Sequence, residues 1–177
     1  MDPKIAVKHE ELRKKIKLAF TDERNQYGER TYAGLLDLDI LRILFKQAVK
    51  IFHPYDADFL KLTEKLNEAL KYEEHQLTVD CENIILKNFY HNFPPYEPNI
   101  GKSELDISVH LLAMNRPEEC EPHIKKAIEI FGVAYGDDCH SYKHCQEILS
   151  ECMKEKRAVE QKAKKLAKKM SKAKIRK

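Results

Sequence analysis

The sequence lacks several features on which whole classes of protein depend. It has no tryptophan, and its five glycines and seven prolines in 177 residues leave few points at which regular structure must break. No run of 18 apolar residues is present, which excludes a membrane-spanning helix of the usual length. The N-terminal stretch MDPKIAVKHEELRKK has no apolar segment of the signal-peptide type. We therefore expect an intracellular protein, in the cytoplasm, the nucleus or both.

Disulfide bonds and β-strands are not indicated either. The five cysteines are odd in number and lie far apart or among histidines, unlike the framework of a small disulfide-stabilised protein. No stretch shows strict period-two alternation bounded by turns, so we expect no strands. Hydrophobic residues make up 42% of the chain, enough for a core, and the length fits one domain with an extension.

The formal net charge of +3 conceals two oppositely charged parts of the chain. Residues 153–177 contain 12 Lys and Arg and two acidic residues, a net charge of +10. Residues 1–152 contain 20 basic and 27 acidic residues, a net charge of −7. We predict a helical domain over residues 1–152 and a basic tail over residues 153–177, each with its own explanation.

Apolar residues recur at helical spacing along almost the whole chain, which predicts an all-α fold of about seven helices. Short connections imply antiparallel neighbours. The second helix is predicted to end before Pro54, which disfavours helical backbone at His53, and Asp56 can cap the third. The predicted inward-facing rows of the first four helices are Ile5, His9, Leu12, Ile16 and Phe20; Leu41, Leu44, Ala48, Ile51 and Phe52; Phe59, Thr63, Leu66 and Leu70; and Leu77, Cys81, Ile84, Ile85, Asn88 and Phe89.

Capping residues predict where the later helices begin and end. Ser103 suits the start of a fifth helix, and Glu118 and Glu119 suit the positive end of a sixth. Pro122 is expected in the first turn of the sixth, where a missing N–H costs little, and Gly136 is expected to end it. A seventh helix is predicted from about Ser141. The inward-facing rows are predicted to be Leu105, Val109 and Leu112; Cys120, Ile124, Ala127, Ile128 and Phe131; and Cys145, Ile148, Leu149 and Cys152.

Two Ala-x-x-x-Phe pairs, Ala48–Phe52 and Ala127–Phe131, indicate helices that cross closely. The tetratricopeptide repeat (TPR), a 34-residue helix pair, needs a small residue where its helices cross and an aromatic residue four positions later. The two pairs are 79 residues apart, which is not a multiple of 34. We therefore predict antiparallel helical hairpins stacked as an irregular TPR-like array, although any helical hairpin can show this short pattern.

Longer segments resemble the C-terminal domain of the SET-and-MYND (SMYD) lysine methyltransferases. They are HPYDADFLKL and the stretch from FPPYEPNIG to CQEILSEC, and the resemblance covers roughly residues 40–152. The matching positions are His53, Pro54 and Tyr55; Phe93, Pro94, Pro95, Pro98 and Gly101; and Glu118, Glu119, Lys126, Ala127, Ile130 and Gly136. The resemblance implies a TPR-like domain that, in full-length relatives, packs beside the SET core, shapes the substrate cleft and engages protein partners.

The catalytic parts of that family are missing from the sequence. There is no Asn-His-Ser-Cys motif of a SET domain, no glycine-rich loop for S-adenosylmethionine and no cysteine-rich MYND zinc module. Asn115 also replaces the glycine expected in the repeat, and Cys139-His140 stands where His-Pro is common. We expect no enzymatic activity from this chain alone, no cofactor and no small-molecule substrate.

The cluster Cys139-His140…His144-Cys145 contains residue types that bind zinc or act as nucleophiles. His140 and His144 would share a helix face, but Cys145 points about 100° away from His144. The C-x2-C spacing of structural zinc sites is absent, and no glycine-rich elbow or oxyanion loop accompanies a Cys–His pair. We predict neither a metal site nor a catalytic site here, with Cys145 in the core.

The basic tail is the most informative exposed feature. Val159, Ala163, Leu166, Met170 and Ala173 recur at helical spacing with lysines around them, which predicts a basic amphipathic helix. Such a helix suits an acidic protein, nucleic-acid phosphates or an acidic membrane, and KKLAKKMSKAKIRK resembles a nuclear-import patch. A solubilising, partly disordered extension is the alternative. The residues predicted to contact a partner are Lys162, Lys164, Lys165, Lys168, Lys169, Lys172, Lys174, Arg176 and Lys177.

Three functions stay open from the sequence. The first is a non-catalytic interaction and regulatory module whose helical groove binds a protein or peptide. The second is the C-terminal portion of a protein-lysine methyltransferase that works only beside a SET domain. The third is binding of nucleic acid or an acidic membrane through the tail, which would be steeply salt-dependent.

Overall fold

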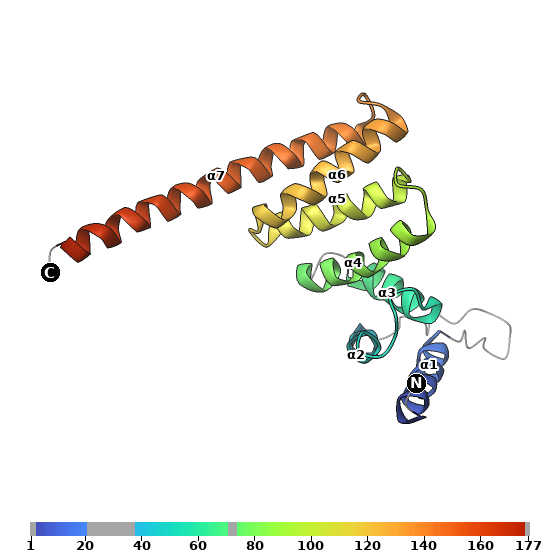
Figure 1. The fold of residues 1–177 in the computed structure, drawn as a ribbon. Coiled ribbons are helices and arrows are strands. Elements are labelled where there is room, and N and C mark those ends of the chain that lie inside the picture. Colours follow the sequence, from blue (N-terminus) through green and yellow to red (C-terminus); the bar gives the residue numbers. More distant parts are fainter. Residues whose placement is uncertain (1–2, 21–37, 71–73, 176–177) are drawn as a thin grey trace. The chain divides into compact units, whose positions relative to one another are not determined.

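Residues 3–20, 38–70 and 74–175 are described by the structure, a computed structural model in which this part of the chain forms seven helices and no strand (Figure 1). The helices are α1 (Pro3–Ala19), α2 (Leu38–Ala48), α3 (Ala57–Leu70), α4 (His75–Asn92), α5 (Pro98–Ala113), α6 (Pro117–Tyr135) and α7 (His140–Ile175). The predicted all-α class is confirmed. The chain divides into two compact units, Met1–Asn92 and Phe93–Lys177. None of the described helices is long and apolar enough to cross a membrane.

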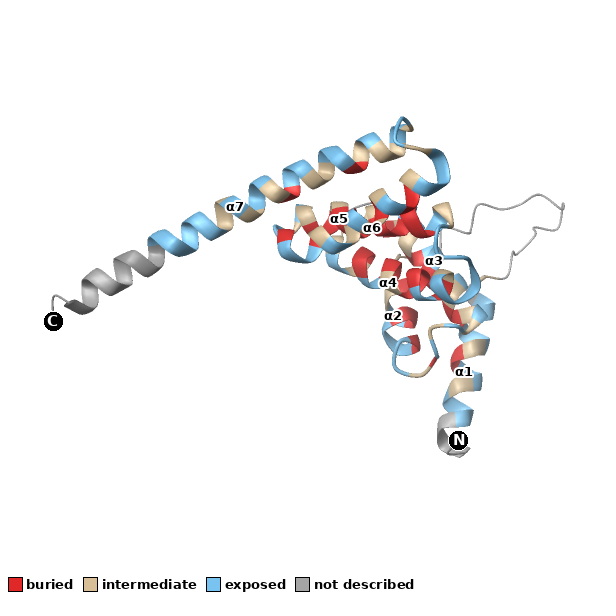
Figure 2. Cartoon of the chain, turned by 45° about the horizontal axis from the view of Figure 1, so that its top comes forward, coloured by how far each residue is buried: buried red, intermediate tan, exposed pale blue. Residues whose placement is uncertain are grey.

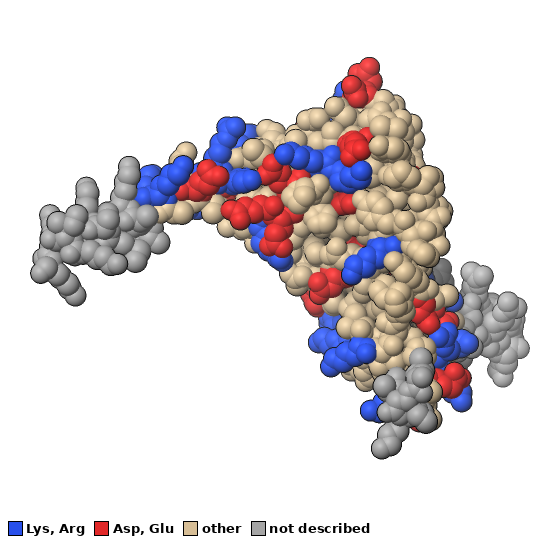
Figure 3. Space-filling view, viewed as in Figure 1, with Lys and Arg blue, Asp and Glu red and all other residues tan. Residues whose placement is uncertain are grey.

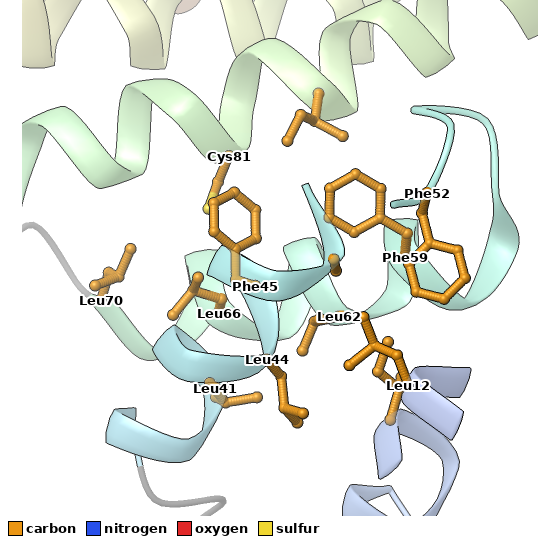
Figure 4. Packing of buried hydrophobic residues seen from close by; sticks show 13 residues of the cluster. Leu12, Leu41, Leu44, Phe45, Phe52, Phe59, Leu62, Leu66, Leu70 and Cys81 are labelled. Atoms are coloured by element: carbon orange, nitrogen blue, oxygen red, sulfur yellow. The ribbon is translucent and has the colours of Figure 1, made fainter. Parts of the chain in front are cut away.

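The first unit packs α1 to α4 around one hydrophobic cluster (Figure 4). Three aromatic rings lie at its centre: the ring of Phe59 is 5.9 Å from that of Phe45 and 6.2 Å from that of Phe52, measured between centroids. Each fully buried Leu or Phe side chain contributes about 1.5–3 kcal/mol to folding. The other members are Leu12, Ile16, Leu41, Leu44, Ala48, Leu62, Leu66, Leu70, Cys81 and Ile84.

The turn between α2 and α3 differs from the prediction. The spacing predicted a helix through Ile51 and Phe52, but α2 ends at Ala48 and a turn follows. The Ala48 carbonyl accepts the N–H groups of Ile51 and Phe52 at 2.9 and 2.8 Å, which tightens the chain before Pro54. Phe52 stays buried in the turn. Ala48 and Phe52 are therefore four positions apart, as on one helix, but they lie in the same core without belonging to the same helix.

Asp56 caps α3, as predicted. Its Oδ1 accepts the backbone N–H groups of Asp58 at 3.0 Å and of Phe59 at 3.2 Å. These donors would otherwise have no partner within the helix. The cap fixes where α3 begins, directly after the turn that holds Phe52.

The second unit consists of α5, α6 and α7, with α6 in contact with both neighbours (Figure 1). Short connections join the three helices, so successive helices run antiparallel. The start of α6 is tied to α7 by a hydrogen bond from the Cys152 thiol to the Pro117 carbonyl, at 3.1 Å. The buried side chains of this unit include Cys120, Ile124, Ala127 and Ile130 of α6 and Cys145 of α7.

α5 and α6 approach closely at Gly101. A Cβ atom on this glycine would lie 3.0 Å from Cγ2 of Ile130 and 3.1 Å from Cε1 of Phe131. Such distances leave no room for a side chain, so α5 presents bare backbone to the Phe131 ring. Ala127, one helical turn earlier on α6, is fully buried. The small residue that faces the Phe131 ring is therefore Gly101 of the neighbouring helix α5.

The turn between α5 and α6 explains why a TPR-like pair usually has glycine where this chain has Asn115. Asn115 has a φ of 57°, in the left-handed region. Its N–H donates to the Leu112 carbonyl at 2.8 Å, and the N–H of Arg116 donates to the Leu111 carbonyl at 2.9 Å. These two bonds form a Schellman motif, which normally uses glycine. Asparagine accepts this backbone conformation better than other side chains do.

The start of α5 differs from the prediction. The helix begins at Pro98, which supplies the φ that a first helical residue needs, and Ser103 is buried inside the helix rather than capping it. Ile107 and Leu111 are buried, whereas the predicted row Leu105, Val109 and Leu112 is only partly buried. Polar residues share the buried face, and the hydroxyl of Ser108 donates to a carbonyl of its own helix at 2.7 Å. An apolar row alone therefore misidentified this face.

The start of α6 is also earlier than predicted. Pro117 occupies the first turn, Glu118 and Glu119 follow there as expected, and Pro122 lies inside the helix. Pro122 is exposed, so the helix tolerates its missing N–H on the solvent side. Gly136, with a φ of 82°, ends α6 as predicted.

α7 is a continuous helix of 36 residues, and the predicted boundary between residues 152 and 153 lies within it. Its length corresponds to roughly 54 Å at the rise of an α-helix. Buried residues are confined to its first half, and the rest of its described side chains are largely exposed (Figure 2). The second half of α7 thus projects from the second unit.

Candidate functional site

α1 is attached to the first unit through Arg13. Its Nη1 and Nη2 atoms donate to Oδ2 of Asp58 and Oδ2 of Asp56, each at 2.5 Å. The three side chains are 15–27% exposed, so water screens the two ion pairs less than it screens pairs on an open surface. Burial alone would lower the pKa of Arg13, but the hydrogen bonds and charges of the two aspartates outweigh it and raise the pKa. Arg13 therefore stays charged.

Phe52 joins α1 to the turn after α2. Its ring meets the ring of His9 edge-on, with 4.2 Å between centroids and 71° between planes. The guanidinium carbon of Arg13 lies 5.4 Å from the centre of the same Phe52 ring, within cation–π range. Since Asp56 also caps α3, one small cluster fixes α1, the turn and the start of α3 together.

A groove lies between α1 and α2 next to this cluster. It encloses about 510 Å³. Its floor contains Leu12, which is buried, and Ile51, which is half-buried. The residues that line it are Lys8, Glu11, Leu12 and Lys15 from α1, with Gln47, Lys50 and Ile51 from α2 and the turn after it. We call this feature the α1–α2 groove.

The three lysines of the α1–α2 groove, Lys8, Lys15 and Lys50, are exposed and have no carboxylate partner among the described residues. Several other lysines behave differently: Lys65, Lys125, Lys126 and Lys156 each form an ion pair at 2.6–2.9 Å. The lining therefore carries three positive charges, from these lysines, and one negative charge, from Glu11. The groove therefore has a positive rim available to an outside carboxylate.

Exposed apolar residues continue the rows that line the groove. On α1, the spacing of Lys8, Lys15 and Leu18 places them on one face of the helix, and Leu18 is 76% exposed. On α2, Ile43 precedes Gln47 by one helical turn and is 55% exposed. Large apolar side chains at such exposure are typical of surfaces that bind another protein.

The four residues predicted to pack helices lie in the interior. Ala48 and Ala127 are fully buried, and Phe52 and Phe131 are 5% and 4% exposed. Ala48 and Phe52 belong to the first unit, and Ala127 and Phe131 belong to the second. None of the four lines the α1–α2 groove, so their place is in the framework.

The basic residues predicted to contact a partner follow residue 161 on α7 and after it. Lys162, Lys164 and Lys165 are exposed. Figure 3 shows Lys and Arg side chains, in blue, on the last part of α7 that it colours. The backbone at Lys168, Lys169, Lys172 and Lys174 is helical, and Arg176 and Lys177 lie outside the described residues. The lysines at 162, 164 and 165 form no ion pair with a described carboxylate, so this stretch is strongly positive.

Glu121 of α6 binds α7 at the point where packing ends. Its Oε1 accepts from Nζ of Lys125 and its Oε2 from Nζ of Lys156, each at 2.6 Å. These hydrogen bonds, with the two positive charges, lower the pKa of Glu121 to about 2. The carboxylate is therefore ionised throughout the neutral and mildly acidic range.

The cysteines and histidines at the start of α7 do not converge on one point. Over residues 3–20, 38–70 and 74–175, no group of three or more His, Cys, Asp and Glu side chains is placed to hold a metal ion. The rings of His140 and His144 lie 6.3 Å apart, while the Cys139 sulfur accepts the N–H of Tyr142 at 3.3 Å. Burial raises the pKa of Cys145 to about 11, which disfavours the thiolate that a nucleophile needs.

The sequence patterns did not single out the groove lysines. Lys8, Glu11 and Lys15 share one face of α1, and this spacing is visible in the sequence. Lys50 could not be added to them, because local spacing does not reveal that α1 lies against the end of α2. That pairing depends on contacts such as those of Arg13, which join residues more than 40 positions apart.

Neither a protein-family model nor a curated protein matches this sequence. Solved structures match its fold. A crystal structure of nearly identical TPR-like repeats of a candidate kinesin light chain from Podosopora anserina has a TM-score of 0.54 at 12% identity, covering 95% of this chain and 94% of that one. A substituted form of the same repeats has a TM-score of 0.52 at 13% identity, covering 96% of this chain and 74% of that one. At such identities the likeness concerns the fold alone: the chain has a TPR-like helical repeat fold.

Proposed function

We propose that this chain is a non-catalytic protein-interaction module whose α1–α2 groove binds an acidic segment of a partner protein. Helical repeat folds commonly present binding surfaces for other proteins. The main support is the set of three exposed lysines, Lys8, Lys15 and Lys50, around an apolar floor. No cofactor and no small-molecule substrate is part of the proposal.

The chemistry of the α1–α2 groove determines what it can bind. Its floor of Leu12 and Ile51 favours an apolar side chain that leaves water on binding. The lysine rim favours carboxylates on either side of that side chain, which raises the association rate and selects the orientation. A segment with one or two apolar anchors flanked by Glu or Asp meets both requirements.

The test uses the full chain and a labelled peptide of about 12 residues with leucines flanked by glutamates, followed by fluorescence anisotropy. A triple variant, Lys8→Glu, Lys15→Glu and Lys50→Glu, reverses the rim charge. A control triple variant, Lys14→Glu, Lys46→Glu and Lys87→Glu, makes the same change at exposed positions outside the groove. Both keep the basic tail, so the tail attracts the peptide equally in each.

We expect the groove variant to bind the peptide roughly tenfold or more weakly than the unmodified chain, since each reversed charge removes an attraction and adds a repulsion. The control variant should change the affinity by less than about threefold, through long-range charge alone. Equal effects of the two variants would show that the peptide does not use the groove, and would contradict the proposal.

We also propose a more specific function: the chain is the C-terminal, regulatory part of a SMYD-type lysine methyltransferase. It is supported by the His53-Pro54-Tyr55 turn, one of the segments that resemble that family. The ring of Tyr55 stacks on His91 of α4, 4.3 Å between centroids, and lies 4.8 Å from the ring of His53. The segment therefore joins the turn before α3 to the end of α4.

The coding sequence upstream of Met1 tests this second proposal. A SET motif in the same reading frame would support it, and full-length transcripts without one would contradict it. We also propose an intracellular location, in the cytoplasm or the nucleus, on the basis of the basic segment KKLAKKMSKAKIRK. A fluorescent fusion with and without residues 164–177 would show whether that segment directs the protein to the nucleus.

A further inference from the structure

α7 continues well past the helices that support it. The Cys152 thiol bonds the carbonyl of Pro117, the first residue of α6, and Lys156 pairs with Glu121, one turn further along α6. Because α6 and α7 are antiparallel, later residues of α7 lie beyond the start of α6. Residues 157–175 are still helical, a length of about 28 Å. Figure 1 shows this stretch as a single helix extending away from α5 and α6.

The row of residues that packs α7 against α6 continues along α7 past the point where this packing ends. Steps of four and three residues alternate along the row, with one charged residue, Lys156, among its members, giving the average period of 3.5 that is typical of coiled coils. Cys145 and Cys152 use this row inside the unit, where both are fully buried. Outside it, Val159 is half-buried and Ala163 is exposed. The whole row is Cys145, Leu149, Cys152, Lys156, Val159, Ala163, Leu166, Met170 and Ala173.

Three of the five residues that flank the outer row are basic. In a heptad labelled with Val159 at d, the flanking e and g positions within the helix are Glu160, Lys162, Ala167, Lys169 and Lys174. A second copy aligned in parallel would place Lys169 against Lys174, which is destabilising. The seam therefore disfavours parallel self-association and favours a helix with acidic flanking residues.

We propose that the outer row of α7, from Val159 to Ala173, is a docking seam for an acidic amphipathic helix of another protein. Apolar residues of the partner fill the a and d layers, where Ala163 and Ala173 allow close approach. Glutamates at the partner's e and g positions pair with Lys162, Lys169 and Lys174. This seam and the α1–α2 groove lie on different helices, so the two proposals can be tested independently.

A helix explains the pattern better than the other acidic partners do. A helix that lies in a membrane interface usually presents Trp, Phe or Leu on its apolar face, whereas residues 153–177 contain no aromatic residue and one leucine, and two of the five outer row residues are alanine. Nucleic-acid phosphates require the lysines but not an apolar row of period 3.5. A coiled-coil partner uses both the period of the row and its basic flanks.

The test measures binding of the full chain to a designed three-heptad peptide with Leu at a and d and Glu at e and g. A peptide of identical composition with the heptad order scrambled controls for charge. Leu166→Gln with Met170→Gln removes the seam, and Lys168→Gln with Lys172→Gln alters the opposite side. Glutamine is a good helix former, and these positions lie beyond the packed core, so circular dichroism should show all variants folded. Anionic vesicles and a DNA duplex are measured in parallel.

We expect the heptad peptide to bind at least about tenfold more tightly than the scrambled peptide, and the seam variant to lose that preference. The variant on the opposite side should keep it, with less than about a threefold change in affinity. Equal binding of the two peptides to the unmodified chain would overturn the proposal. So would a seam substitution that releases the chain from vesicles or DNA but leaves its affinity for the heptad peptide unchanged.

Discussion

Gly101 of α5 lies so close to Phe131 of α6 that a Cβ at position 101 would stand 3.1 Å from the aromatic ring. Gly101→Val should therefore destabilise the second unit by about 1–3 kcal/mol, because the branched side chain forces Phe131 or the α5 backbone to move. Urea unfolding followed by circular dichroism measures the change.

Lys102→Val is the matched control for this substitution. Position 102 is exposed on the same helix, so Lys102→Val removes only the attraction of Lys102 for Asp106 and the helix propensity that valine lacks, about 0.5 kcal/mol. If both variants unfold at the same urea concentration, the close approach of α5 and α6 does not contribute to stability as argued.

The ion pair between Arg13 and Asp56 should couple α1 to the start of α3. In a double-mutant cycle with Arg13→Met and Asp56→Asn, we expect a coupling energy on the order of 1–2 kcal/mol, because both side chains are largely buried. The pair of Arg42 with Asp39, where Asp39 is 76% exposed, should give less than about 0.5 kcal/mol. Similar coupling in the two cycles would mean that α1 is not held by the Arg13 cluster.

Asn115 should respond to substitution according to its backbone conformation. Asn115→Gly should leave stability unchanged or raise it by a few tenths of a kcal/mol, since glycine adopts the left-handed conformation without strain. Asn115→Val should cost about 1–2 kcal/mol at the same position. Thermal unfolding of the three proteins distinguishes this pattern from one in which only side-chain size matters.

The hydrogen bonds that Glu121 accepts from Lys125 and Lys156 predict that the stability of the fold depends on pH. The pKa of Glu121 is lowered in the folded chain from its ordinary value of 4.5 to about 2. Its contribution is therefore complete above pH 4.5 and disappears as the pH falls towards 2. The melting temperature of the unmodified chain should exceed that of Glu121→Gln at pH 6, and the difference should shrink by pH 2.

The exposed neighbour Glu151 provides the control for this titration. Glu151→Gln should change the melting temperature little at any pH, because no described basic side chain pairs with Glu151. A difference between the unmodified chain and Glu121→Gln that stays constant from pH 6 to pH 2 would contradict the proposed role of the Glu121 carboxylate.

Local patterns predicted most of the fold because each helix carries its own periodic row and its own end signals. Asp56 and Gly136 act where they were expected, since capping depends on a few neighbouring residues. The buried face of α5 was misidentified because Ser108 is polar, and only the structure shows that its hydroxyl bonds within the helix.

The candidate site was less predictable than the helices. Lys8 and Lys15 belong to α1, and Lys50 follows α2, so the α1–α2 groove exists only once these helices are packed together. That packing is set by contacts distant in sequence, such as Arg13 with Asp58. Spacing within one helix carries no information on such contacts.

The most direct test of the proposed function is a nuclear magnetic resonance titration of the isotope-labelled full chain with the acidic, leucine-containing peptide. If the α1–α2 groove is the binding site, the amide signals that shift most should belong to residues 8–15 and 47–51, and the shifts should vanish in the Lys8→Glu, Lys15→Glu, Lys50→Glu variant. Shifts confined to residues 153–177, or an unchanged spectrum at saturating peptide, would contradict the proposed function.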